Sequence, residues 1–262
     1  MQNNTFQFNR FFRLIKRELN HQTKTKLFFL IAFGGLPVFL FLLNILQGND
    51  FLDVNARMNF LLIIMTIIFI FSPFIFFYGV NHPKKGLIDV MLPASVFEKY
   101  LYMQLASIIT APLFALVVYG GVDAVLSLLA PSVFKGSAVV HTIIYLQNTG
   151  WQTYTNLFIF QQLIFFFNLY FVTHKLLKTI GTALVFQIAL TALVILIIKL
   201  AFPMLFENED LYINIPGKGS LIFAQSDSAI EVIMKSFRLF FYFIFPVTLV
   251  IGSYLRMKSI RY

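Results

Sequence analysis

NHPKKGLIDVMLPASVFEK, residues 81–99, is a polar segment between two long apolar runs, and we call it the polar island. The chain of 262 residues is 59% hydrophobic and only 12% charged, whereas roughly a quarter of the residues in globular proteins are charged. In lipid, a helix satisfies its own backbone hydrogen bonds. The composition therefore indicates an all-α integral membrane protein whose spans a soluble partner could contact at the polar island.

Apolar runs of about 20 residues are long enough to cross roughly 30 Å of hydrocarbon as helices. They predict six transmembrane helices, at 27–46, 58–80, 101–121, 154–172, 180–200 and 237–255. We interpret 122–151 as an exterior segment with short helices on or dipping into the membrane, and 202–236 as a second exterior region. No repeat or linker divides the chain, so residues 1–262 form a single transmembrane domain.

The distribution of lysine and arginine predicts which side of the membrane the loops face. The side that carries both termini and the polar island has 14 of the 20 basic residues, and the other side has 8 of the 11 acidic ones. Both termini are therefore expected in the cytoplasm, and the pI of about 9.7 needs no nucleic-acid partner. Residues 1–26 have no signal-peptide pattern, so we expect the mature chain to begin at Met1.

Residues 6–20, FQFNRFFRLIKRELN, have the pattern of a basic amphipathic helix. Such a helix lies along the cytoplasmic surface, with aromatic side chains at the headgroup boundary and basic ones toward anionic lipid. The membrane-surface residues are Phe8, Phe11, Phe12 and Ile15 on the apolar side and Arg10, Arg13, Lys16 and Arg17 on the basic side. The alternative is a solvated helix that only leads into the first span.

Within the polar island, Leu87, Ile88, Met91 and Leu92 can share one face of a short helix while Asp89 points away. Proline 93 ends that helix because it supplies no backbone donor and restricts the residue before it. Ser95 and Glu98 then have the spacing of a capping box at the start of the third span. The alternative is an ordinary basic loop that follows the positive-inside rule.

Several kinds of chemistry are missing from the sequence. It has no cysteine, no phosphate-binding G-x-x-x-x-G-K-[ST] loop and no H-E-x-x-H motif, and its four histidines are scattered. We therefore predict no catalytic, cofactor-binding or metal-binding residue in this chain. Of the ionisable residues, only Lys199 comes close to a span interior, which argues against an ion-coupled carrier. The spans also contain amide side chains, which either line a polar path for a substrate or hold helices together. They are Asn44, Gln161, Gln162, Asn168 and Gln187.

The order of these features resembles the membrane subunit of bacterial ATP-binding-cassette exporters of the type-2 permease family. That order is a basic amphipathic helix, two spans, a cytoplasmic segment reading M-L-P-A-S-x-x-E-K, and four more spans. Many members have an arginine just after the serine, where this chain has Val96 and Phe97. The whole-chain topology therefore carries more of the likeness than the short motif does.

The resemblance implies a function for the polar island. In that family this segment is the coupling helix, which sits in a groove of a separate cytoplasmic ATPase. ATP and Mg²⁺ then bind in that partner, and two permease subunits, identical or different, rock to open a path outward. The implied ATPase-coupling residues are His82, Pro83, Lys84, Lys85, Leu87, Ile88, Asp89, Met91, Leu92, Pro93, Ser95 and Glu98.

The expected function is thus that of a non-catalytic permease subunit in the bacterial cytoplasmic membrane. Its expected partners are an ATPase subunit, a second permease subunit and membrane lipid, with no nucleic acid. The alternative is a membrane scaffold or assembly factor of similar topology that transports nothing. A lipid-modifying membrane enzyme is disfavoured because the sequence offers no catalytic groups.

Overall fold

The computed structural model describes residues 6–21, 23–48, 52–77, 80, 94–201 and 235–259, and no strand occurs among them. The all-α prediction is therefore confirmed for this part of the chain. The helices are α1 Phe8–His21, α2 Thr23–Leu46, α3 Val54–Phe77, α5 Val96–Leu105, α6 Ala111–Leu129, α7 Ala138–Asn148, α8 Trp151–Tyr170, α9 Lys175–Ala201 and α12 Phe245–Ser259. Two π-helical segments, η1 Ala106–Thr110 and η2 Phe240–Ile244, precede α6 and α12.

Five helices in the described residues are long and apolar enough to cross a membrane. They are Leu27–Leu46, Val54–Phe77, Val96–Leu129, Lys175–Leu193 and Lys235–Ser259. The chain thus has the character of a multi-pass membrane protein. The helix α8, predicted as the fourth of six spans, is 20 residues long but is not among the five. It carries several amide side chains, so the count of six spans stays a prediction.

Two predicted boundaries are wrong in a way that matters for the site. Helix α3 begins at Val54 rather than at 58, and α6 continues to Leu129 rather than ending at 121. Arg57 and Asp123 consequently lie within helices and not in exterior loops. The segment 122–151, for which short exterior helices were predicted, contains the end of α6 and the helix α7, and its exterior location stays a prediction. Most of the second predicted exterior region, 202–234, lies outside the described residues.

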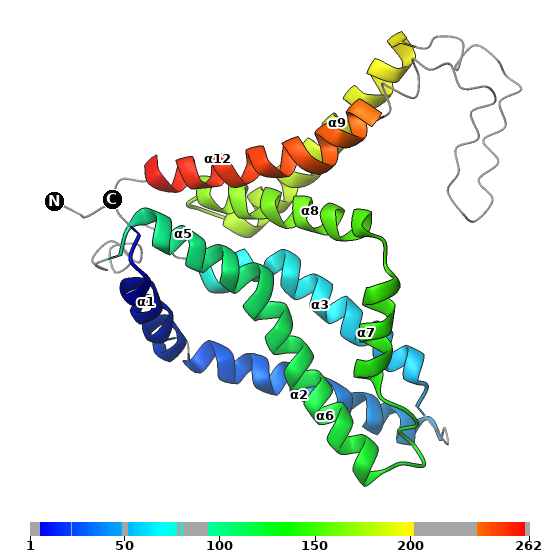
Figure 1. Ribbon diagram of the computed structural model, residues 1–262. Coiled ribbons are helices and arrows are strands. Elements are labelled where there is room, and N and C mark those ends of the chain that lie inside the picture. The colour runs from blue at the N-terminus through cyan, green and yellow to red at the C-terminus, as the bar shows by residue number, and fades with distance from the viewer. Residues whose placement is uncertain are drawn as a thin grey trace, which may run out of the picture.

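Helices α3 and α8 lie at the centre of the arrangement (Figure 1). One apolar cluster joins α3 to α6 through Leu61, Ile68, Ala115 and Tyr119. Another joins α3, α5 and α8 and includes Phe165, which is fully buried. At opposite ends of the bundle, α1 and α7 run across the direction of α8 and α12 (Figure 1).

Prolines within the helices leave backbone carbonyls without their usual donors. Pro73 lies inside α3, and the hydroxyl of Ser72 lies 3.2 Å from the carbonyl of Phe69, four residues before the proline. Pro112 and Pro246 are the second residues of α6 and α12, which directly follow η1 and η2. Wider π-type turns ahead of a proline are one way in which membrane helices accommodate it.

Close packing between α6 and α7 depends on Gly120. A Cβ at this position would clash with Cγ2 of Val139, whereas one at Gly121 would meet nothing within 4 Å. Small residues allow helices to approach in this way. The two neighbouring glycines therefore form a matched pair for a packing test.

We expect Gly120→Ala to lower the free energy of unfolding by about 1–3 kcal/mol, because the added methyl group overpacks the contact with Val139. Gly121→Ala should raise it by about 0.5–1 kcal/mol, because alanine favours the helix more than glycine does. Denaturant titration in mild detergent measures both changes. Adding Val139→Ala should recover part of the loss, and a neutral Gly120→Ala would contradict the proposed contact.

Candidate functional site

The capping box predicted at the start of the third span is present. Ser95 precedes α5, its hydroxyl accepts a hydrogen bond from the backbone N–H of Glu98 (3.2 Å), and its own N–H donates to Glu98 Oε2 (2.8 Å). Both side chains are buried, Glu98 completely. The cap fixes the direction in which the chain enters α5 at the end of the polar island.

Glu98 also holds helix α1. The guanidinium of Arg10 donates from Nε to Glu98 Oε2 at 2.9 Å and from Nη2 to Oε1 at 2.8 Å, which is the two-pronged geometry that arginine forms with carboxylates. The backbone N–H of Gln7 donates to the same Oε1 at 2.8 Å. The hydrogen bond to Glu98 raises the pKa of Arg10. One buried carboxylate thus joins α1 to the first turn of α5.

Apolar contacts reinforce this junction. Leu14 of α1 is buried and packs with Ala94 and Tyr102. The ring of Phe6 lies 6.0 Å from that of Phe97, which in turn lies 6.0 Å from Tyr254 of α12. The beginning of α5 is therefore packed between α1 and α12.

The structure divides the predicted membrane-surface residues of α1 into two groups. Phe11 is buried in the protein, and Arg10 is bound to Glu98. The remaining side chains are exposed or half-buried, namely Phe8, Phe12, Arg13, Ile15, Lys16 and Arg17. These retain the composition of a membrane-surface face, and their contact with lipid remains a prediction.

Most of the predicted ATPase-coupling residues lie outside the described residues. They are His82, Pro83, Lys84, Lys85, Leu87, Ile88, Asp89, Met91, Leu92 and Pro93. The two described members, Ser95 and Glu98, are the capping pair. The predicted short helix of the polar island is therefore untested, and the structure describes only the start of α5 that follows it and the contact of α5 with α1.

A second polar site lies at the other end of the bundle and was missed by the sequence analysis. Arg57 of α3 and Asp123 of α6 form a fully buried ion pair, with 2.6 Å between Nη1 and Oδ1. Arg57 Nη2 also donates to the carbonyls of Lys135 and Gly136, at 2.8 and 3.1 Å. Asp123 Oδ2 accepts from the N–H of Ala138 at 3.2 Å. The pair thus holds the loop 130–137 and the start of α7 against α3 and α6.

The aromatic residues around this pair complete its enclosure. The guanidinium carbon of Arg57 lies 4.9 Å from the ring centre of Phe134, which is a cation–π distance. The hydroxyl of Tyr119 donates to the backbone carbonyl of Arg57 at 3.1 Å. Arg57 Nε has no hydrogen-bond partner. The pair is thus nearly, but not completely, satisfied by protein groups.

Amide side chains form a third polar site between helices. Gln104 of α5 and Gln162 of α8 exchange two hydrogen bonds, of 3.1 and 2.8 Å, and Gln162 also donates to Gln161 at 2.7 Å. Gln104 donates to the hydroxyl of Tyr100, which donates to the carbonyl of Val250 in α12. These side chains join α5, α8 and α12, which agrees with the prediction that the amides hold helices together. Gln187, by contrast, is exposed.

These sites bind helices to one another. No group of three or more histidine, cysteine, aspartate or glutamate side chains that could hold a metal ion occurs in the described part of the chain. The charged groups of Glu98 and Arg57 are engaged in ion pairs. The arrangement is suited to holding or transmitting the relative positions of helices.

No protein-family model matches the chain, and neither a curated protein nor a solved structure shows significant similarity to it.

Proposed function

We propose that this chain is the non-catalytic transmembrane subunit of an ATP-driven exporter in the bacterial cytoplasmic membrane. It would form half of a translocation path with a second permease subunit, identical or related, and both termini would lie in the cytoplasm. A separate cytoplasmic ATPase would bind ATP and Mg²⁺ and dock on the polar island.

The buried carboxylate of Glu98 is the observation that carries the proposal. Glu98 lies five residues after Pro93, which ends the predicted coupling helix. Its carboxylate ties the first turn of α5 to α1 through Arg10 and Gln7. A force applied to the polar island from the cytoplasm would therefore move α1 and α5 together. Such a rigid junction is what a coupling element requires, because a mobile loop would absorb the displacement.

The six-span topology is part of the same proposal. We assign α8 as the fourth span because the polar groups in its second half turn inward: Gln161, Gln162 and Asn168 are buried between helices. Asn168 Nδ2 donates to the carbonyl of Pro73 in α3 at 3.1 Å. Amides engaged between helices lower the cost of placing such a helix in hydrocarbon.

Co-purification in mild detergent tests the proposal against a scaffold that moves nothing. We expect an ATPase subunit from the same organism to accompany the tagged full-length chain and to hydrolyse ATP in the complex. The absence of such a subunit, together with the absence of a neighbouring gene for one, would overturn the exporter proposal.

Charge substitutions in the polar island test where the ATPase docks. Leu87→Asp or Met91→Asp should uncouple ATP hydrolysis from transport, because either would bury an unpaired carboxylate in the ATPase groove. Lys258→Asp, a charge change at an exposed residue outside the polar island, should leave coupling unchanged. The ratio of transport to ATP hydrolysis in proteoliposomes measures the effect, and wild-type ratios in both polar-island variants would contradict the docking site.

A further inference from the structure

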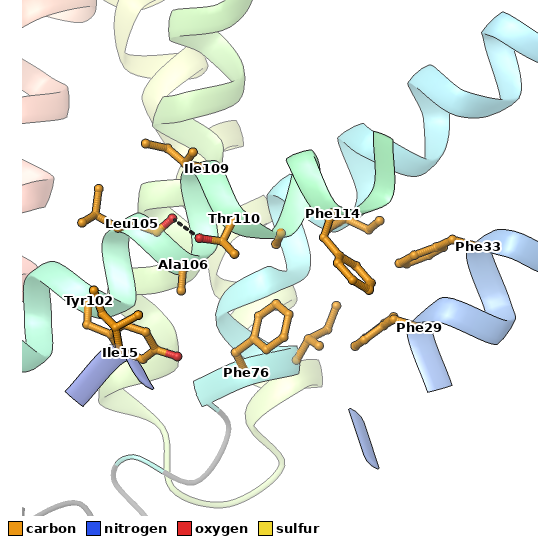
Figure 2. Close-up of a pocket in the computed structure, with 13 residues that line it drawn as sticks. Ile15, Phe29, Phe33, Phe76, Tyr102, Leu105, Ala106, Ile109, Thr110 and Phe114 are labelled. Carbon is orange, nitrogen blue, oxygen red and sulfur yellow. Dashed lines mark hydrogen bonds between the residues drawn. The ribbon is translucent and has the colours of Figure 1, made fainter. Parts of the chain in front are cut away.

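An apolar pocket of about 470 Å³ lies between α1, α2, α3 and the segment from α5 to α6. This volume falls within the roughly 300–1,000 Å³ range of small-molecule sites. Phe29 and Phe33 of α2 lie on one side, Phe76 of α3 on another and Phe114 of α6 above, as Figure 2 shows. No charged side chain is among the residues that line the pocket.

The pocket opens on the outer surface of the helices. Leu105, Ile109 and Thr110 line it and are exposed, and the hydroxyl of Thr110 is directed to the carbonyl of Leu105 within its own helix. These residues belong to the candidate span Val96–Leu129. A ligand that enters the pocket from that side comes from the hydrocarbon layer of the membrane. The apolar side chains that line the pocket favour the binding of an acyl chain.

Helix α1, which lines the pocket through Ile15, carries exposed basic side chains. Ile15 of α1 forms part of the wall (Figure 2), and the neighbouring Arg13, Lys16 and Arg17 on the same helix are exposed. Arg10 is held by Glu98, which fixes α1 in position. Basic residues at a membrane surface attract anionic headgroups.

We infer that this pocket holds one acyl chain of an anionic phospholipid whose headgroup lies against Arg13 and Lys16. The apolar wall supplies the affinity for the chain, and the cations of α1 select the headgroup. The phosphate and any further anionic group stay at the polar boundary, where α1 crosses the direction of the spans (Figure 1). This inference is independent of the exporter proposal, since it needs no ATPase.

Native mass spectrometry of the full-length chain in mild detergent tests the inference. The protein is incubated with equal amounts of phosphatidylglycerol and phosphatidylcholine that have the same acyl chains. We expect the wild type to retain phosphatidylglycerol preferentially. Ala106→Phe should lower the retention of both lipids about tenfold, because the methyl group of Ala106 faces the pocket (Figure 2) and a phenyl ring would fill it.

The headgroup is tested separately. Each basic side chain near an anionic surface contributes roughly fivefold in affinity, so Arg13→Gln with Lys16→Gln should reduce the preference for phosphatidylglycerol about 25-fold. Both residues are exposed, so the double variant should fold. The matched control, Lys178→Gln with Lys258→Gln, removes two exposed cations elsewhere and should keep the preference.

Two results would overturn the inference. If Ala106→Phe retains as much lipid as Ala124→Phe, a control at an exposed alanine of α6 outside the pocket, then the acyl chain does not occupy the pocket. If the wild type retains both lipids equally, then the α1 cations do not select the headgroup. Circular dichroism and gel filtration of the two phenylalanine variants show whether each is folded, so a loss of lipid caused by unfolding is distinguished from one caused by a filled pocket.

Discussion

Replacing Arg57 with methionine is expected to lower the free energy of unfolding by about 3–5 kcal/mol, because it leaves the buried carboxylate of Asp123 without its counter-ion. Neither side chain is exposed to solvent. Asp123→Asn should be destabilising for the converse reason, since it leaves the guanidinium uncompensated. Denaturant or thermal unfolding in mild detergent measures both effects.

The double variant Arg57→Met with Asp123→Leu sharpens this prediction. Replacing both members of a buried ion pair by apolar residues is often neutral or stabilising, so the double variant should be more stable than either single one. Arg238→Met, at an exposed arginine, is the control and should remain within about 0.5 kcal/mol of the wild type. Equal stability of Arg57→Met and this control would show that the ion pair contributes nothing.

Loss of Arg57 should also release the loop 130–137 that it holds. Its Nη2 donates to the carbonyls of Lys135 and Gly136, and Leu52 donates its N–H to the carbonyl of Val133 at 2.9 Å. Hydrogen exchange in 130–137 should therefore rise in Arg57→Met beyond the change seen in Arg238→Met. At this end of the bundle, the ion pair and its hydrogen bonds hold α3, α6 and the loop 130–137 together.

Replacing Glu98 with glutamine is expected to speed hydrogen exchange across α1 at least about tenfold, because hydrogen bonds to a charged group are the stronger kind and several converge on this carboxylate. Glutamine keeps the size of the side chain but removes its charge and one acceptor. The first turn of α5 should also exchange faster as the capping box weakens. Helix α8, which makes no hydrogen bond to Glu98 in the described residues, is the internal reference.

Matched variants on α1 separate the ion pair from general charge effects. Arg10→Gln should reproduce the effect of Glu98→Gln, and the two together should add little, since both remove the same interaction. Arg13→Gln, at an exposed arginine one turn away, should leave exchange unchanged. Unchanged protection of α1 in Glu98→Gln would show that the apolar contacts of Leu14 suffice to hold the helix.

The same variant bears on the proposed exporter. If the junction at Glu98 transmits motion from the polar island, then Glu98→Gln should lower the ratio of transport to ATP hydrolysis while the ATPase still co-purifies. Loss of α1 protection without any change in that ratio would confine Glu98 to a structural role.

Features that depend on neighbouring residues were predictable. The first span, Leu27–Leu46, has the predicted bounds because its apolar run is uninterrupted. The Ser95 and Glu98 cap was predictable because the spacing of three residues brings the two groups together in any helix that starts there. The ends of α3 and α6 were placed wrongly because Arg57 and Asp123, read singly, are charges that belong outside a membrane.

The sequence alone determined the all-α membrane class, most of the apolar helices and the cap at Ser95, because these follow from composition, periodicity and the local geometry of the backbone. Only the tertiary structure decided which polar groups meet. Arg57 and Asp123 are 66 positions apart, Arg10 and Glu98 are 88 apart, and Gln104 and Gln162 are 58 apart. Their pairing depends on how the helices pack, and packing brings an acid and a base together wherever burying either one alone would cost too much free energy.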